Sequence, residues 1–152
     1  MQTKTLTISG QGAMKDYPAV ASEEYLSPWR VYRDELEKVI IETGVTHIGE
    51  HAFDEQAALK EVIIPDTVTT IGEFAFSETS ALTQITIPAS ITTIGQSAFA
   101  KATGLTQITI PNTVTSIGLH AFDGATGLKQ IVIPDSVTQI GRGAFRDCAA
   151  LE

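Results

Sequence analysis

The amino-acid sequence predicts a repeat solenoid, in which short parallel β-strands wind around one shared apolar core. Three observations predict this fold class. A unit of 23 residues recurs from residue 36 to residue 150 without insertion or deletion. The same positions are apolar in every unit. Several of these positions alternate with variable ones, which is the period-two pattern of a strand with one buried face.

The 23-residue period divides the chain into five complete repeats, whose positions we number from 1 to 23. The predicted repeats are residues 36–58, 59–81, 82–104, 105–127 and 128–150, and each begins with leucine. Positions 4, 6, 10 and 13 always hold valine or isoleucine, and position 18 always holds phenylalanine. One such unit cannot bury its own apolar edge, whereas stacked units share a continuous core.

Positions 3 to 6 of each repeat predict the first strand. In the third repeat Ile85 and Ile87 are the inward pair, and they alternate with Gln84 and Thr86. Valine and isoleucine at the inward positions favour the extended state. Proline follows at position 7 in four of the five repeats. It ends the strand because it has no N–H to give to a ladder.

Positions 10 to 13 predict a second, shorter strand, with Val68 and Ile71 as its apolar residues in the second repeat. Glycine closes this strand at position 14 of every repeat. We expect this glycine either to turn the backbone through positive φ or to lie too close to a neighbour for a Cβ. The Ala-Phe pair at positions 17 and 18 is expected on a short helical or 3₁₀ turn, with the phenylalanines stacked inside.

Residues 1–35 are not a full repeat, and we predict that they form an N-terminal capping segment. A terminal repeat exposes a cross-section of the core, which needs a cover. Within this segment TKTLTISG predicts a strand and GQGAM a turn. The side chains expected to cover the first coil are Leu6, Ile8, Met14, Tyr17, Trp29 and Tyr32. A ligand platform is the alternative interpretation of the two aromatic residues Trp29 and Tyr32, and capping is favoured over it.

Residues 151–152 are Leu-Glu, which is either the start of a sixth repeat or a vector scar that suits the frame. In both cases we expect the native protein to continue. The last coil has no expected cover. We therefore hypothesise that its exposed face, around Ile131, Ile133, Ile140 and Phe145, drives end-to-end self-association.

The net charge of −8 is unevenly distributed. Residues 1–78 carry 14 acidic and 6 basic side chains, and residues 79–152 carry four of each. No cluster of lysine and arginine occurs, so nucleic acid is not an expected partner. No apolar run approaches the roughly 20 residues of a membrane-spanning helix, and we expect no membrane insertion. The first residues also lack the apolar region of a signal peptide.

The sequence contains no recognisable catalytic, cofactor or metal site. The single cysteine, Cys148, excludes an internal disulfide and a cysteine-based zinc site. His47 and His51 have the spacing of a metal pair on a helix, but Gly49 between them marks a predicted turn. Uniform coils offer no cleft across which paired carboxylates could face each other. We therefore predict that the protein is not an enzyme.

The exposed, variable positions 2, 3 and 5 of the first strand are the better candidates for contact with a partner. Side by side they form uncharged ladders, and LTQITIP recurs letter for letter at residues 82–88 and 105–111. The candidate partner-binding residues are Thr83, Gln84, Thr86, Thr106, Gln107, Thr109, Gln130 and Val132. A flat, uncharged sheet surface suits a protein or glycan partner. The threonine at position 11 of every repeat is expected instead to hydrogen-bond along the stack.

The pattern L-x-x-I-x-I-P-x-x-V-T-x-I-G-x-x-A-F resembles the leucine-rich repeat of the BspA-like type, found in bacterial surface antigens. The stretch LTISGQGAM before the first repeat is similar to a stretch that often precedes the repeats of that family. In that family Cys or Asn is common three residues after the phenylalanine of a repeat. In this chain only the last repeat has such a residue, Cys148. The resemblance implies a right-handed, leucine-rich-repeat-like coil, mainly of short parallel strands with short helical or 3₁₀ turns.

The resemblance also implies a secreted or cell-surface bacterial protein with a role in cell adhesion. The leading hypothesis is a non-catalytic module that binds a protein of the host or of a bacterial surface through the exposed sheet face. The alternative is a structural spacer that holds another domain of a longer protein. A glycan-binding surface is a second alternative, although the threonine ladder ends at Ile63 and Val132.

Overall fold

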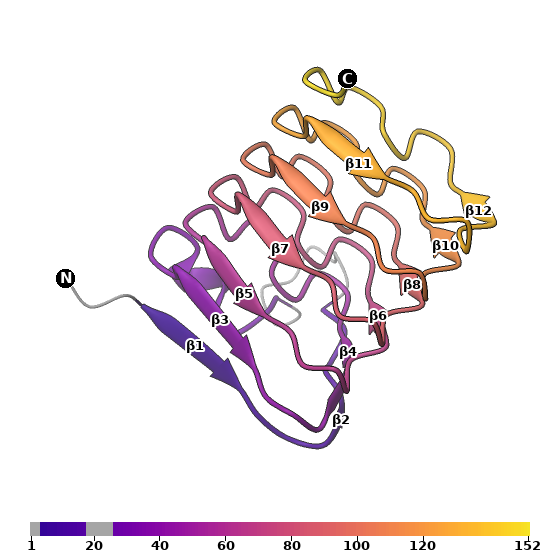
Figure 1. Cartoon of the computed structure of the whole chain (residues 1–152). Helices are drawn as coiled ribbons and strands as arrows, with labels where there is room; N and C mark the ends of the chain where they lie inside the picture. The colour runs from indigo at the N-terminus through magenta and orange to yellow at the C-terminus, as the bar shows by residue number, and fades with distance from the viewer. Residues whose placement is uncertain (1–3, 18–25) are drawn as a thin grey trace.

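The computed structural model of the chain describes residues 4–17 and 26–152. The chain winds as a solenoid in which each coil contributes one strand to a first face and one to a second sheet (Figure 1). The first face contains β1 (Thr5–Ile8), β3 (Lys38–Ile41), β5 (Glu61–Ile63), β7 (Gln84–Thr86), β9 (Gln107–Thr109) and β11 (Gln130–Val132). The second sheet contains β2 (Gly12–Ala13), β4 (Val45–Ile48), β6 (Thr70–Ile71), β8 (Thr93–Ile94), β10 (Ser116–Ile117) and β12 (Gln139–Ile140).

Paired strands are parallel, and from β3 onward their register equals the sequence period. Ile85 lies opposite Ile108 on the first face, and Ile71 lies opposite Ile94 in the second sheet. Equivalent positions of successive repeats therefore lie above one another. Inward residues form buried columns, and outward residues form ladders on the surface. The predicted solenoid of short parallel strands is confirmed.

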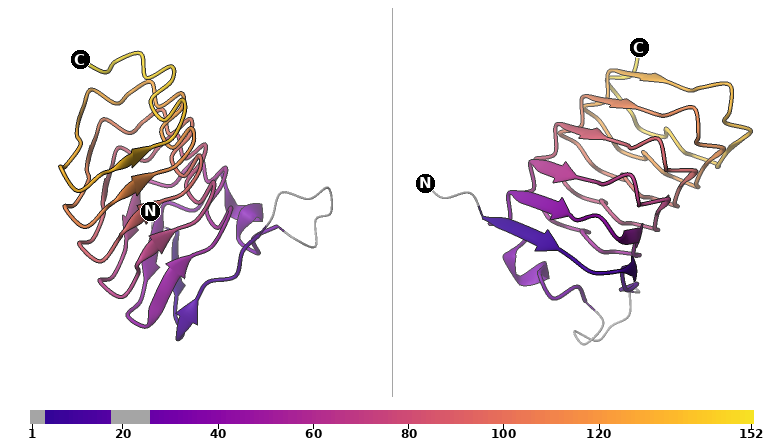
Figure 2. Two further views of the ribbon diagram at one scale, coloured as in Figure 1. Left: turned by 90° about the vertical axis from the view of Figure 1, so that its right-hand side faces the viewer. Right: turned by 60° about the horizontal axis from the view of Figure 1, so that its bottom comes forward.

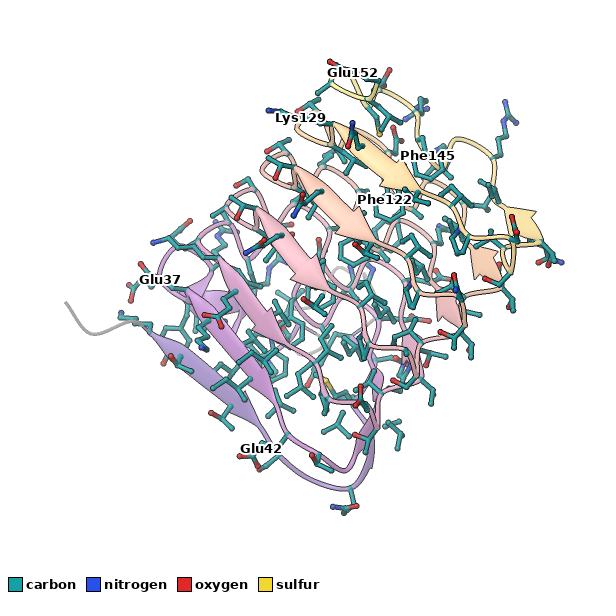
Figure 3. All side chains as sticks on the ribbon, in the orientation of Figure 1. Glu37, Glu42, Phe122, Lys129, Phe145 and Glu152 are labelled. Atoms are coloured by element: carbon teal, nitrogen blue, oxygen red, sulfur yellow. The ribbon has the colours of Figure 1, made fainter. Side chains whose placement is uncertain are left out.

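A column of phenylalanines runs through the core. The rings of Phe53, Phe76, Phe99, Phe122 and Phe145 stack in order, with centroids 5.4–5.5 Å apart and planes inclined by 4–14°. Figure 3 labels two successive members, Phe122 and Phe145, on the inner side of the coils. The first four of these side chains are fully buried. The predicted stacking of position 18 is confirmed.

The glycines at position 14 allow successive coils to approach closely. A Cβ on Gly95 would lie 2.7 Å from the carbonyl carbon of Gly72, and one on Gly72 would lie 2.7 Å from the carbonyl oxygen of Ile48. Both obstacles are backbone atoms that cannot move aside. None of the five glycines at position 14 has a positive φ. Of the two roles expected for this glycine, close approach is therefore the one that the structure shows.

The third side of the coils consists of hydrogen-bonded turns, and no helix forms around the Ala-Phe pairs in the described residues. Positions 16 and 20 of each repeat adopt the left-handed conformation, as at Phe74 (φ 54°) and Glu78 (φ 56°). A left-handed residue every fourth position prevents a right-handed helix from propagating. The backbone amides point along the stack instead. The Phe74 N–H donates to the Gln96 carbonyl in the next coil, and the Phe76 N–H donates to the Ala98 carbonyl.

The N-terminal segment extends both sheets by one strand. β1 pairs with β3, and β2 pairs with β4, at the end of the stack where the chain begins (Figure 2). Five of the six residues predicted to cover the core pack against it: Leu6, Ile8, Met14, Tyr17 and Trp29. Residues 1–3 and 18–25 of this segment lie outside the described residues. The division of the chain into a cap and five repeats stays a prediction.

Two details of this segment differ from the sequence-based expectation. Gly12 and Ala13, predicted within a turn, form β2, because a backbone hydrogen bond from Gly12 N–H to the Gly44 carbonyl brings them alongside β4. Tyr32, predicted to cover the core, is 53% exposed. It belongs to the 3₁₀ helix η2 (Arg30–Tyr32), and Trp29, immediately before this helix, is the residue that stacks on Phe53 of the first coil.

Candidate interaction surface

The eight candidate residues lie together on one exposed surface, which we call the sheet face. It consists of the outward side chains of β7, β9 and β11 with the residues before β7 and β9: Thr83, Gln84, Thr86, Thr106, Gln107, Thr109, Gln130 and Val132. All eight are exposed. Gln84, Gln107 and Gln130 stand in one ladder through the register of these strands. The role of these residues in binding stays a prediction.

The pleat of the strands explains why these side chains point outward. In β7 the inward Ile85 is buried, and its neighbours Gln84 and Thr86 are forced to the opposite side. The same alternation recurs in β9. The hydroxyl of Thr106 donates to the carbonyl of Thr83 at 3.2 Å, so part of the ladder is tied to the backbone. The surface is therefore polar and lies on strands that are joined by continuous ladders.

The same face is chemically different on β3 and β5. Here two ion pairs join successive coils, Lys60 with Glu37 at 3.0 Å and Lys38 with Glu61 at 2.9 Å. Ile63 follows at position 5 and is 42% exposed. A groove of about 630 Å³ separates this charged part from the sheet face, and it is lined by residues 60–64 and 83–86.

Two histidines form local pairs on the turn side, a feature that the sequence analysis missed. His51 Nδ1 lies 2.8 Å from an Asp54 carboxylate oxygen, and His120 Nδ1 lies 3.1 Å from Asp123. The His51 ring also stacks flat on Phe74 in the next coil, with centroids 4.6 Å apart. Burial raises the pKa of Asp54 above its ordinary value. The repeated spacing H-x-x-D at residues 51–54 and 120–123 was the available signal.

Each of these pairs joins two residues three positions apart in the same turn. His47, the other histidine considered as a metal ligand, contacts the hydroxyl of Thr70 through Nδ1 at 2.5 Å. Within residues 4–17 and 26–152, no three His, Cys, Asp or Glu side chains are grouped so that they could hold a metal ion. In the same residues, no helix has the length and apolar character needed to cross a membrane.

A second cavity lies at the N-terminal end. It has a volume of about 440 Å³ and mostly apolar walls, which include Leu6, Trp29, Tyr32 and Leu36. Trp29 also contacts the first coil. Its ring stacks on Phe53, and its indole N–H donates to the Ala52 carbonyl at 2.5 Å. These contacts support the capping role expected for Trp29, which stays a prediction.

The residues of the last coil are more exposed than their counterparts in the coils before it. Ile140 is 52% exposed, whereas Ile117 at the same position is 1% exposed. Ile131, Ile133 and Phe145 are partly buried, and Phe145 contacts the phenylalanine column on one side through Phe122. Self-association through this coil stays a prediction.

Known proteins share both the sequence pattern and the fold. The family described as the BspA type leucine rich repeat region, with six copies, matches residues 31–152. Comparison with the curated proteins finds no match. A leucine-rich repeat protein of T. pallidum is similar in fold, with a TM-score of 0.74 over 97% of this chain and 78% of its own, at 23% identity.

Two further solved structures are more similar in sequence. A leucine-rich cell surface protein of Faecalibacterium prausnitzii is 29% identical, with a TM-score of 0.64 over 99% of this chain and 46% of its own. A leucine-rich repeat protein of Bacteroides ovatus is also 29% identical, with a TM-score of 0.59 over 78% of this chain and 37% of its own. The chain thus corresponds to less than half the length of these two proteins. With its repeat pattern matched over residues 31–152 and its fold shared, the chain belongs to the BspA type leucine-rich repeat family.

Proposed function

We propose that the chain is a non-catalytic protein-interaction and adhesion module of a secreted or cell-surface bacterial protein, and that it binds a protein partner through the sheet face. The observation that supports this proposal is the array of eight exposed, uncharged side chains in ladders along hydrogen-bonded parallel strands. Extended surfaces of this kind are what solenoids use for recognition. The likeness to a cell surface protein of Faecalibacterium prausnitzii supports the location.

The composition of the sheet face suits contact over a broad area. Threonine and glutamine side chains donate and accept hydrogen bonds without the desolvation cost of a charge. Val132, 76% exposed, adds apolar area at one border. The paired Glu37–Lys60 and Lys38–Glu61 groups at the other border are already satisfied within the chain. A partner with a polar, uncharged contact surface therefore fits best.

The test is a charge substitution with a matched control. A triple variant, Thr86→Glu, Gln107→Glu and Thr109→Glu, places three negative charges on the sheet face. The control variant, Thr69→Glu, Thr92→Glu and Thr115→Glu, places three on the exposed threonine column beside the second sheet. Binding to an immobilised extracellular-matrix preparation and to intact host cells is measured for both variants and for the unmodified chain.

Loss of binding in the sheet-face variant, with binding retained in the control, is the expected result. Equal loss in both variants shows that general repulsion, and not this face, controls binding. Absence of binding by the unmodified chain favours the second candidate function, a structural spacer. That alternative has its own support, because the chain covers only 46% and 37% of the two 29%-identical proteins.

A further inference from the structure

The first face contains one break between its strands. β1, β3 and β5 form one hydrogen-bonded sheet, and β7, β9 and β11 form another. β5 and β7 lie side by side (Figure 1), yet no ladder joins them in the described part of the chain. We call this boundary the seam.

A column of backbone hydrogen bonds at position 2 locates the seam. Lys60 N–H donates to the Glu37 carbonyl at 2.8 Å, and Thr106 N–H donates to the Thr83 carbonyl at 3.0 Å. The column continues through Lys129 to Glu152, and Figure 3 labels Glu37, Lys129 and Glu152 along it. At the seam, no bond joins the Thr83 amide to the carbonyl of Lys60, although both residues lie within the described range 26–152.

The groove described above lies on the seam. Its volume is about 630 Å³, and its lining consists of residues 60–64 of one coil and 83–86 of the next, so it runs along the two strands that no ladder joins. The topology and the cavity are independent observations. Both single out the same pair of coils.

The other two sides of these coils are closed. In the second sheet β6 pairs with β8, with Thr70 opposite Thr93. On the turn side the Phe74 amide donates to the Gln96 carbonyl at 2.9 Å. In the core Phe76 stacks on Phe99 at 5.5 Å, the same spacing as elsewhere in the column. The two coils are thus held on two sides and open on the third, which is the geometry of a hinge.

The side chains explain why the break falls here. Before the seam, successive coils are tied by opposite charges, as Lys38 is to Glu61. After the seam, identical uncharged residues lie opposite each other in successive coils, as Gln84 does opposite Gln107. Across the seam Lys60 meets Thr83 and Glu61 meets Gln84, and neither combination forms a side-chain bond. Cross-strand pairs stabilise a sheet, and at positions 2 and 3 this step lacks the ion pairs that join β3 to β5.

We propose that the seam is a joint at which the first face opens and closes while the second sheet and the phenylalanine column hold the coils together. Closing needs no change of register, because Lys60 and Thr83 occupy the same position of successive repeats. The joint lies at the border of the sheet face and changes the spacing between Ile63 and Thr86. It concerns the chain alone and does not depend on the proposed function.

The repeated heptad LTQITIP supplies an internal control for the test. Residues 82–88 and 105–111 have the same sequence, so corresponding amides from Thr83 onward have the same intrinsic exchange rates. Hydrogen exchange of the intact chain is followed residue by residue by NMR. We expect the amides of Thr83 and Thr86 to exchange on the order of 10²-fold faster than those of Thr106 and Thr109, which belong to a closed ladder. Equal rates for the two heptads overturn the proposal.

A closing variant distinguishes a joint from a fixed gap. Thr83→Glu with Gln84→Lys reproduces across the seam the charge pairs that join β3 to β5. We expect this variant to slow exchange at residues 83 and 86 toward the rates at residues 106 and 109. The control, Thr106→Glu with Gln107→Lys, places the same residues at a closed step and leaves the rates at residues 83 and 86 unchanged. Exchange at the seam that stays fast in the closing variant shows a fixed gap and also overturns the proposal.

Discussion

The indole ring of Trp29 stacks on the ring of Phe53, with centroids 5.5 Å apart and planes inclined by 25°. Trp29 thus extends the phenylalanine column by one ring beyond the first repeat. Tyr17 packs edge-to-face against the indole, with ring centroids 5.7 Å apart. Through these contacts Tyr17 and Trp29 pack against the N-terminal end of the phenylalanine column.

Trp29→Ala is expected to lower the free energy of unfolding by about 3 kcal/mol, the lower end of the range for buried aromatic residues, because it removes a large, partly buried ring from the end of the column. Trp29→Phe keeps a ring in this place and is expected to cost less. Tyr32→Ala is the control, since Tyr32 is 53% exposed. Denaturant unfolding of the three variants measures the effect. A loss in Tyr32→Ala as large as that in Trp29→Ala contradicts the assignment of Trp29 as the cover.

Gly95→Ala is expected to destabilise the chain by about 1–3 kcal/mol, because a methyl group here overpacks the space between two coils. The new Cβ would lie 2.7 Å from backbone atoms of the preceding coil. Thr92→Ala, at an exposed position of the same coil, serves as the control. Thermal unfolding compares the two variants, and a neutral Gly95→Ala shows that the coils can separate at this point without cost.

Phe99→Ala is expected to cost about 3–5 kcal/mol, because the ring is fully buried between two neighbours in the column. Phe145→Ala removes a ring that contacts only Phe122 in the column and is partly exposed. We expect a smaller loss for Phe145. The comparison uses the same substitution at the same position of two repeats, so equal losses contradict the difference in burial.

Glu55→Gln is expected to change the pH dependence of stability. A hydrogen bond from Arg30 holds the pKa of the Glu55 carboxyl below its ordinary value of 4.5, with Arg33 adding to the effect. Since the folded state lowers this pKa, Glu55 stabilises the fold above about pH 4.5, and this contribution is lost as the pH falls through the lowered value. The variant is therefore less stable at pH 7, by less than about 1 kcal/mol because the pair is partly exposed.

Urea unfolding from pH 3 to pH 7 checks this prediction. The difference between Glu55→Gln and the unmodified chain is expected to shrink toward the acid end. Glu73→Gln, at an exposed glutamate of the next coil, is the control for removal of a charge. A difference that stays constant across the range contradicts the role of the ionised carboxylate.

The chain of residues 1–152 is expected to self-associate end to end as its concentration rises, because the last coil exposes apolar side chains such as Ile140. Ile140→Lys is expected to shift the equilibrium toward monomer. Leu119→Lys, at a residue 46% exposed on the preceding coil, is the control. Light scattering over a concentration series measures the effect, and a strict monomer at high concentration rules out the association.

Part of the candidate surface followed from the sequence, and part did not. The outward direction of Gln84 and Thr86 follows from the alternation with Ile85, because successive side chains in a strand point to opposite faces. The seam beside them did not follow, since Leu82 to Pro88 and Leu105 to Pro111 have identical residues but different neighbours. The residues within one heptad do not determine how its strand pairs with the strand of the neighbouring coil.

The sequence by itself determined the solenoid, the strand positions within the repeats, the inward columns and the stacked phenylalanines, because residues 23 positions apart occupy equivalent places in successive coils. Only the tertiary structure decided that Gly95 serves close approach, that residues such as Phe74 adopt positive φ, and that β5 and β7 part at the seam. These features depend on distances between coils and on backbone conformations forced by the neighbours. Such quantities arise only when the repeats are packed together.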